Sequence, residues 1–320
     1  MQQNRIYKQQ CVQALFPNSL KNVFSNVIRD YEEVAEIRIR QNGPVLVRKE
    51  KEQFYLNEEG AYIMDANKGI CICSDEFAQL FSHICRHSVY AFEQELKNGY
   101  LTVEGGHRIG VVGQTVWENE QIKGIKNLSA LNMRIAHERK GIADSVLPYI
   151  AEGARLRSTL LVSPPGCGKT TLLRDLVRKI SNGSHYLQPQ NVSLIDERSE
   201  IASCYLGVAQ NDVGRHTDVL DACPKAKGIL LVLRSMSPQV IAVDELGGAA
   251  DYEAMKQAFY LGCKILATIH GNQFETLRKH DALKNILGTG GFERIIILDN
   301  KDGPGRIIGI YNAKGEQLLC

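Results

Sequence analysis

The residues of this sequence best suited to chemistry lie between positions 159 and 171, which run Thr-Leu-Leu-Val-Ser-Pro-Pro-Gly-Cys-Gly-Lys-Thr-Thr. Gly166 and Gly168 allow backbone torsions that point successive amides inward, where they can bind oxyanions. Lys169 can reach the β- and γ-phosphates of ATP, and the Thr170 hydroxyl can coordinate Mg²⁺. The segment therefore predicts a phosphate-binding loop for ATP and Mg²⁺, with these contact residues: Pro165, Gly166, Cys167, Gly168, Lys169, Thr170 and Thr171.

The loop departs from the usual pattern at one position. That pattern expects glycine first, and this chain has Ser163 there. An ordinary glycine-rich turn is the alternative interpretation. The apolar strand expected before the loop, over 159–162, and the helix expected after it, over 172–180, favour phosphate binding.

A nucleotide hydrolase also needs carboxylates at the end of a neighbouring strand. Residues 240–243 are apolar, and Asp244 and Glu245 follow them directly. Asp244 is predicted to hold Mg²⁺ through water, and Glu245 to orient and deprotonate the attacking water. Without the phosphate loop, two solvated acids at a strand end would be the simpler interpretation.

Polar residues follow two other predicted strands. In a parallel sheet the carboxyl ends of the strands share one edge, where ligands bind. Thr268 and His270 are expected to sense the γ-phosphate at that edge, and a packed or capping histidine is the alternative for His270. The other predicted strand, over 192–196, ends in a group of acids. Asp196 and Glu197 are predicted metal ligands, and Glu200 is predicted to be catalytic.

Phosphoryl transfer also benefits from an arginine directed at the γ-phosphate. Arg215 and Arg234 are the candidates in the second part of the chain, and a surface ion pair is an equal alternative for each. Further arginines lie among apolar strand residues in the first part, a placement found both at interfaces and on solvated faces: Arg38, Arg40, Arg108 and Arg134.

The elements that must position these residues divide the chain in two. Residues 1–138 mix short strands, helices and turn signals, which predicts a small α+β domain without a nucleotide loop. Residues 139–156 are predicted to be a hinge. Over 157–320 apolar strands alternate with helical segments, which predicts an α/β domain with a mostly parallel sheet.

The composition of the chain limits the kinds of protein that it could be. The 320 residues are 44% hydrophobic and 23% charged, as in globular proteins, and the net charge of +2 gives no reason to expect nucleic acid. No apolar run approaches the length of about 18–20 residues that spans a bilayer. The N-terminus lacks the apolar segment of a signal peptide, so we expect a cytoplasmic protein.

The nine cysteines do not show the paired spacing that is typical of zinc sites, and they are expected to be reduced.

These motifs together resemble the secretion and type IV pilus ATPases, RecA-like members of the phosphate-loop NTPases. In that family a Leu-Arg pair and a proline precede the apolar strand that ends in the catalytic glutamate, matched here by Leu233, Arg234, Pro238 and 240–245. Many members have glycine where this chain has Asp244. The resemblance implies a homo-oligomer, a hexameric ring, with the nucleotide bound between the N-terminal and C-terminal domains.

Other segments resemble the family of sporulation stage III AA proteins, and this resemblance runs nearly from end to end. They include 36–40, 88–92, 105–108, 131–135, 196–200 and 218–225. The resemblance implies a cytoplasmic ATPase, peripheral at the membrane, that energises or assembles a sporulation channel of integral membrane proteins between mother cell and forespore.

Two other functions stay open. One is a nucleic-acid-stimulated RecA-like motor, which the neutral charge balance and the absence of a basic-aromatic cluster disfavour. The other is a nucleotide-gated scaffold with little hydrolysis, which the presence of Glu245 disfavours.

Overall fold

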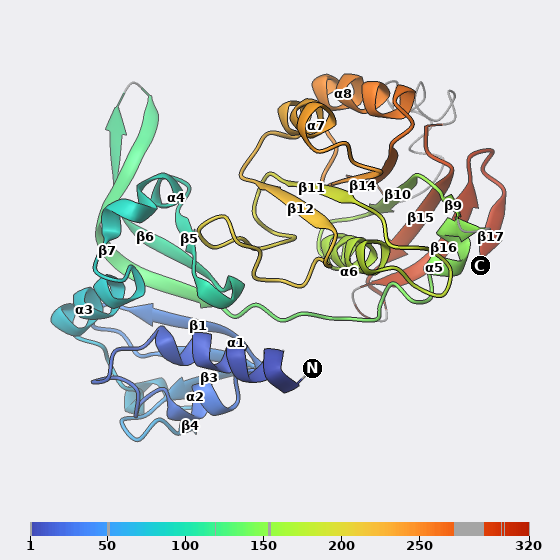
Figure 1. Cartoon of the computed structure of the whole chain (residues 1–320). Coiled ribbons are helices and arrows are strands. Elements are labelled where there is room, and N and C mark those ends of the chain that lie inside the picture. Colours follow the sequence, from blue (N-terminus) through green and yellow to red (C-terminus); the bar gives the residue numbers. More distant parts are fainter. Residues whose placement is uncertain are drawn as a thin grey trace. The chain divides into compact units, whose positions relative to one another are not determined.

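The computed structural model describes residues 2–49, 52–118, 120–152, 155–271, 291–301, 303 and 305–319. The chain divides into two compact units, Met1–His137 and Glu138–Cys320. The expected fold class is confirmed, because the second unit is α/β and the first is built on an antiparallel sheet (Figure 1). Within the described ranges, no helix combines the length and the apolar character needed to cross a membrane.

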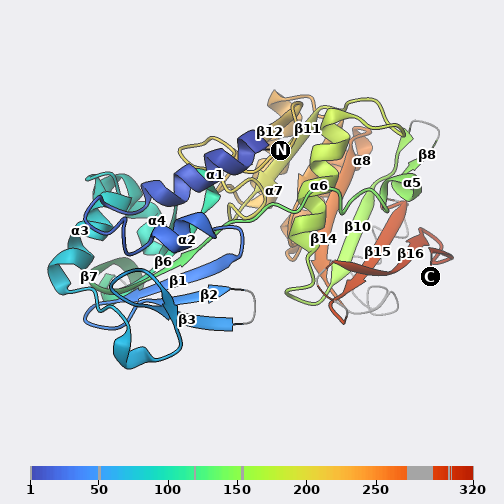
Figure 2. The ribbon, with the colours of Figure 1, turned by 90° about the horizontal axis from the view of Figure 1, so that it is seen from below.

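The first unit is built on a seven-stranded antiparallel sheet in the order β4-β3-β2-β1-β7-β6-β5. Helices α1 and α2 lie over one face of this sheet (Figure 2). Its described elements are α1 (Gln2–Ala14), α2 (Ser25–Arg29), β1 (Val34–Arg40), β2 (Leu46–Lys49), β3 (Glu52–Leu56), β4 (Tyr62–Ile63), α3 (Ser74–Ile84), α4 (Glu93–Lys97), β5 (Tyr100–Thr102), β6 (Arg108–Glu118) and β7 (Gln121–Arg134).

The alternation of residues along β1 separates the two faces of this sheet. Ile37 and Ile39 are fully buried, whereas Arg38 and Arg40 are exposed. Residues paired directly across neighbouring strands lie on the same face of a sheet, so the pairing of β1 with β2 and β7, and of β7 with β6, places further residues on each face. The face opposite the apolar core, called the arginine face below, holds Arg38, Arg40, Arg48, Arg108 and Arg134.

One buried carboxylate lies within the arginine face. Glu36 is paired in register with Arg48 on β2 and Arg134 on β7, and it forms ion pairs with Arg38 and Arg48. Burial acts to raise the pKa of Glu36, but the hydrogen bond from Arg38 and the charges of Arg38 and Arg48 outweigh it, so the pKa is lowered. Glu36 therefore stays ionised and neutralises only part of the positive charge of this face.

A buried histidine holds the end of the first unit in place. His107 is fully buried, and its Nδ1 accepts a hydrogen bond of 3.1 Å from the amide of Ala136. Burial, with smaller effects of Lys8 and His137, lowers the pKa of His107 to about 3. The imidazole is therefore neutral at pH 7, with its proton on Nε2.

We expect the first unit to lose about 2 kcal/mol of stability between pH 7 and pH 5 through His107 alone. The unfolded chain binds a proton at this histidine below pH 6.5, whereas the folded chain resists protonation down to about pH 3. Stability from a depressed pKa is fully present above the unfolded value and is lost as the pH falls. Amide hydrogen exchange in the first unit, corrected for intrinsic rates, measures the loss. The His107→Gln variant should depend less on pH, and an equal dependence would contradict the assignment.

The second unit is a mixed sheet between helices. Its eight strands run β12-β11-β13-β14-β10-β15-β16-β17, parallel up to β15 and antiparallel beyond it. Helix α6 lies on one face, and α7 and α8 lie on the other (Figure 1). The described elements are α5 (Leu147–Ile150), β8 (Ala151–Glu152), β9 (Arg155–Leu156), β10 (Thr159–Ser163), α6 (Lys169–Asn182), β11 (Val192–Asp196), β12 (Thr217–Asp221), α7 (Lys225–Ser235), β13 (Val240–Val243), α8 (Ala249–Tyr260), β14 (Lys264–His270), β15 (Arg294–Asp299), β16 (Arg306–Asn312) and β17 (Gln317–Leu319).

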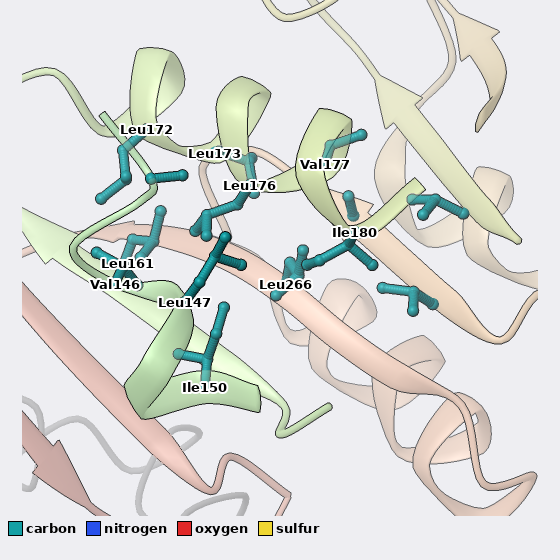
Figure 3. Close-up of a cluster of buried hydrophobic side chains, with 14 of the residues drawn as sticks. Val146, Leu147, Ile150, Leu161, Leu172, Leu173, Leu176, Val177, Ile180 and Leu266 are labelled. Carbon is teal, nitrogen blue, oxygen red and sulfur yellow. The ribbon is translucent and has the colours of Figure 1, made fainter. Parts of the chain in front are cut away.

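Figure 3 shows the core that orients α6 on the sheet. Buried apolar residues recur at helical spacing from Leu172 to Ile180 and form one face of the helix. This face belongs to the same cluster as Leu161 of β10 and Leu266 of β14. The packing holds the first turn of α6 at the carboxyl end of β10.

The segment 139–156, expected to be a hinge, is instead packed in large part into this core. Val146 and Ile150 are fully buried in the cluster that contains α6. The carboxylate of Asp175, on α6, accepts a hydrogen bond of 2.8 Å from the amide of Gly141. The physical reason is the spacing of apolar residues over one helical turn, which produces a buried face rather than a solvated linker.

Strand β12 was not among the strands expected from the sequence. It pairs in parallel with β11 and forms the edge of the sheet. Its five residues, 217–221, include only Val219 and Leu220 as apolar residues. Such a short and polar segment carries no clear strand period, so the pairing with β11 decides its conformation.

Candidate nucleotide site

The predicted phosphate loop lies where a buried strand leads into a helix. Strand β10 is buried along its whole length, and α6 begins at Lys169. Gly166 and Gly168 have φ values of 74° and 86°, which side chains rarely adopt. Gly168 is the N-cap of α6, so the free amides of the first turn border the loop. This geometry suits an anion such as a phosphate group.

The ammonium group of Lys169 is buried beneath this loop. Its Nζ donates to the carbonyl oxygens of Ser163 and Pro164 at 3.0 and 3.1 Å, and to the Ser163 hydroxyl at 3.3 Å. Burial lowers the pKa of Lys169, and the nearby carboxylates after β13 act in the opposite direction. Ser163, the departure from the usual pattern, therefore takes part in holding the lysine.

A line of polar contacts connects Lys169 to the acidic end of β13. Nζ of Lys169 lies 3.2 Å from Nδ1 of His270, which must therefore accept, so the imidazole proton is assigned to Nε2. That nitrogen lies 3.3 Å from Oε1 of Glu245. The other oxygen, Oε2, lies 2.8 Å from a guanidinium nitrogen of Arg198. Both oxygens of Glu245 thus have a partner.

Glu245 follows β13 in an uncommon backbone conformation. Its φ is 53°, in the left-handed region that residues with side chains seldom adopt. Its amide donates to the Thr268 hydroxyl at 2.8 Å and to Oδ1 of Asp244 at 3.1 Å. These bonds hold the strained residue, which is a feature often found at functional sites.

Thr170 and Asp244 lie together at the start of α6. The Thr170 hydroxyl donates to Oδ2 of Asp244 at 2.7 Å, and the Thr268 hydroxyl donates to Oδ1. Mg²⁺ in phosphate sites is usually held by one or two protein oxygens together with water and phosphate oxygens. Among the described residues, no three His, Cys, Asp or Glu side chains are grouped so as to hold a metal by themselves. The hydroxyl–carboxylate pair fits an ion that binds with its nucleotide.

Asp196 and Glu197, predicted as metal ligands, have other partners. Asp196 is only 1% exposed, and its two oxygens accept hydrogen bonds of 2.8–2.9 Å from the amides of residues 200–202. Burial raises the pKa of Asp196, and these amides oppose the shift. Glu197 forms an ion pair with Lys225. These contacts assign Asp196 to shaping the turn 197–202, and neither acid is directed at Thr170 in the contacts described.

A small pocket lies between the ends of β11 and β13. Its volume of about 10 Å³ is near the smallest that can hold one water molecule. Glu200 and Glu245 line it, as do two cations, Arg198 and Lys225. A larger pocket, of about 720 Å³, lies at the opposite edge of the sheet, around the first residue of β14. The predicted catalytic acids border the small pocket and not the large one.

The structure does not bring the two candidate arginines to this site. Arg215 is exposed, and its amide donates to the side chain of Asn182 at the far end of α6. Because α6 has 14 residues, its two ends are about 20 Å apart. Arg234 is exposed in the last turn of α7, which ends before the start of β13, also at the opposite edge. A role for either arginine stays a prediction, and it would have to be toward a neighbouring subunit.

One residue that supports the site was not expected from its sequence pattern. Arg174 of α6 donates to the carbonyl oxygens of Glu200 and Ile201 at 2.6 and 2.5 Å. Burial lowers the pKa of Arg174, and surrounding carboxylates oppose the shift. The residue joins α6 to the turn 197–202. Its place near the start of the helix expected after the predicted phosphate loop is the signal that could have identified it.

Comparisons with known proteins agree with this architecture. The model of a family described as "Sporulation stage III, protein AA" matches residues 6–318. Stage III sporulation protein AA of Bacillus subtilis (strain 168) is 38% identical over 305 residues, covering 95% of each chain. The solved structure of the Legionella pneumophila ATPase DotB is similar with a TM-score of 0.59 at 15% identity, covering 93% of this chain and 81% of that one. The pilus retraction motor PilT with bound ADP gives a TM-score of 0.56 at 16% identity, covering 86% and 77%.

Proposed function

The chain belongs to the family of sporulation stage III AA proteins, and on this premise we propose that it is an Mg²⁺-dependent ATP hydrolase. One observation carries the proposal. The phosphate loop, the Thr170–Asp244 pair and Glu245 meet at the carboxyl edge of one parallel sheet, in a fold similar to that of secretion ATPases. Ligands of open α/β sheets bind at this edge.

The residues have complementary roles in such a reaction. The loop amides and Lys169 would bind the β- and γ-phosphates, with Lys169 exchanging its carbonyl partners for phosphate oxygens. Thr170 and Asp244 would hold Mg²⁺, which neutralises phosphate charge when bound. Glu245 would orient the attacking water and accept its proton. His270 lies between Lys169 and Glu245, so it would couple phosphate binding at the loop to the position of the Glu245 carboxylate.

Release of phosphate from ATP by the full chain tests the proposal directly. We expect turnover with Mg²⁺ and its loss when EDTA is added, because the Thr170–Asp244 pair fits a bound metal. A chain that binds ATP without turnover would favour a nucleotide-gated scaffold. Stimulation by DNA or RNA would favour a nucleic-acid motor.

We further propose that the site is completed across a ring of subunits. Arg215 and Arg234 lie far from the phosphate loop of their own chain, and the arginine face of the first unit carries an excess of positive charge. Arginines in these places suit a triphosphate held by another domain or subunit. In the cell, such a ring would act at the membrane on integral membrane proteins of a sporulation channel, driving or assembling it.

Specific activity should therefore rise with protein concentration until the oligomer has formed. Arg234→Ala and Glu245→Gln subunits, each inactive alone, should recover some activity when mixed, because some mixed interfaces would carry a complete set of groups. Arg215→Ala is tested in the same way. Phosphate release measured across dilutions and mixtures provides the readout. Activity that is flat on dilution, without recovery in any mixture, would indicate a self-contained monomeric site.

A further inference from the structure

The carboxylate of Glu245 is held by an arginine of its own chain. A guanidinium nitrogen of Arg198 lies 2.8 Å from Oε2, while His270 lies near Oε1. Charge-assisted contacts of this kind are among the stronger hydrogen bonds in proteins. These two groups each occupy an acceptor site on the carboxylate, and they compete there with a water molecule that Glu245 would orient and deprotonate. The contact therefore opposes the role proposed for Glu245.

The backbone that carries Arg198 is firmly held. Asp196 accepts three amide hydrogen bonds from residues 200–202. Ser199 has a φ of 51°, and its hydroxyl donates to Asp221 at 2.6 Å. By contrast, the Arg198 side chain is 65% exposed. The side chain can thus change its partner by rotation, without any change in the turn.

The small pocket lies within reach of this side chain, and among the described residues five carboxylates line it beside Arg198 and Lys225. Arg198 lines the small pocket together with Asp244 and Glu245, the acids proposed to hold the metal and the attacking water. Lys225, the other cation of the pocket, forms an ion pair with Glu197 and is largely buried. Arg198 is therefore the more exposed of the two cations of this pocket, and it lies beside the acids proposed to hold the metal and the attacking water.

We propose that Arg198 acts as a nucleotide-dependent switch on Glu245. On binding of ATP, its guanidinium leaves the carboxylate and contacts the γ-phosphate, which frees Glu245 to orient and deprotonate water. ADP lacks the γ-phosphate, so it leaves the ion pair in place. The carboxylate of Glu245 is thus released from Arg198 only in a site that holds a triphosphate. This inference rests on the proposed ATP hydrolysis and supplies, within one chain, the arginine that Arg215 and Arg234 do not provide.

The test is a double-mutant cycle on the full chain, with affinities for a nonhydrolysable ATP analogue and for ADP measured by titration calorimetry. In the Glu245→Gln background, Arg198→Ala should weaken binding of the analogue by about 10- to 100-fold, which corresponds to the loss of one charge-assisted hydrogen bond. In the wild-type background, Arg198→Ala should weaken binding of the analogue less. There, Arg198 must break its ion pair with Glu245 before it can contact the phosphate, so its net contribution to affinity is smaller. ADP affinity should change little in both backgrounds.

A static ion pair predicts the opposite order. Removing Arg198 would then expose the phosphate to the bare carboxylate of Glu245, so the larger loss would occur in the wild-type background. That order, or equal losses for ADP and the analogue, would overturn the switch while leaving ATP hydrolysis intact. A wild-type chain that neither binds nor hydrolyses ATP would instead contradict the proposed function, and the inference with it.

Matched variants separate this effect from general loss of charge or fold. Lys256→Ala removes a cation of α8 that is paired with Glu253, and it should leave both affinities unchanged. Arg198→Lys keeps the charge and should lie between wild type and Arg198→Ala, since a lysine makes a single point contact. Thermal unfolding of each variant confirms that the comparison is between folded proteins.

Discussion

Replacing Glu245 with glutamine is expected to lower the rate of ATP hydrolysis by about 10²- to 10⁴-fold while nucleotide binding is retained. The amide keeps the shape of the side chain and can still contact water, but it cannot accept the proton. Affinity for ATP should stay similar or rise, because a negative charge near the phosphates is removed and Arg198 loses a competing partner. Single-turnover hydrolysis and equilibrium binding, measured on the same preparation, separate the two effects.

Glu253→Gln is the matched control for this variant. Glu253 is an exposed carboxylate of α8, 69% accessible and paired with Lys256, so the same chemical change there should leave turnover unaltered. Near-normal turnover in Glu245→Gln would show that another group activates the water. Glu200, which lines the same small pocket, would then be the first residue to examine.

Replacing Lys169 with alanine should reduce ATP affinity by about 10- to 100-fold, and turnover should fall with it. The loop amides would remain, but the main cation over the β- and γ-phosphate oxygens would be absent. ADP affinity should fall as well, because the lysine reaches the β-phosphate. Titration calorimetry with both nucleotides measures the loss.

The Lys169→Ala result must be separated from damage to the loop, because the buried ammonium also bonds the carbonyl oxygens of Ser163 and Pro164. Lys179→Ala provides the comparison, since Lys179 lies in the last turn of α6 and pairs with Asp144. It removes a lysine from the same helix at the end far from the loop. Unchanged ATP affinity in a folded Lys169→Ala variant would contradict the assignment of the phosphate loop.

Much of the site was predictable because its chemistry is carried by neighbouring residues. The run from Ser163 to Thr171 contains the glycines, the lysine and the hydroxyl within a single strand–turn–helix connection. The acids after β13 follow an apolar strand directly, so their place at the carboxyl edge followed from a parallel sheet. The same argument placed His270, which lies in register with Ser163. The local spacing of residues was enough to predict the position of a side chain wherever that position depended only on one strand or helix and on where that element ends.

The choice among similar residues was made by tertiary structure. Asp196 and Asp244 both follow apolar strands, but Asp196 turns to backbone amides and Asp244 to Thr170. Arg215 and Arg234 were the arginines expected at the phosphate, yet the length of α6 and the direction of α7 place them at the opposite edge.

The sequence by itself determined that the chain contains a glycine-rich strand–turn–helix segment with a lysine and, separately, an apolar strand that ends in acids, because each of these features depends on residues a few positions apart. Only the tertiary structure decided that Arg198 reaches Glu245, that Arg174 supports the turn beside it and that Val146 belongs to the core. Each of these contacts joins elements distant in sequence. They follow from the strand order β11-β13-β14-β10 and from the packing of α6, which no local period of hydrophobic residues specifies.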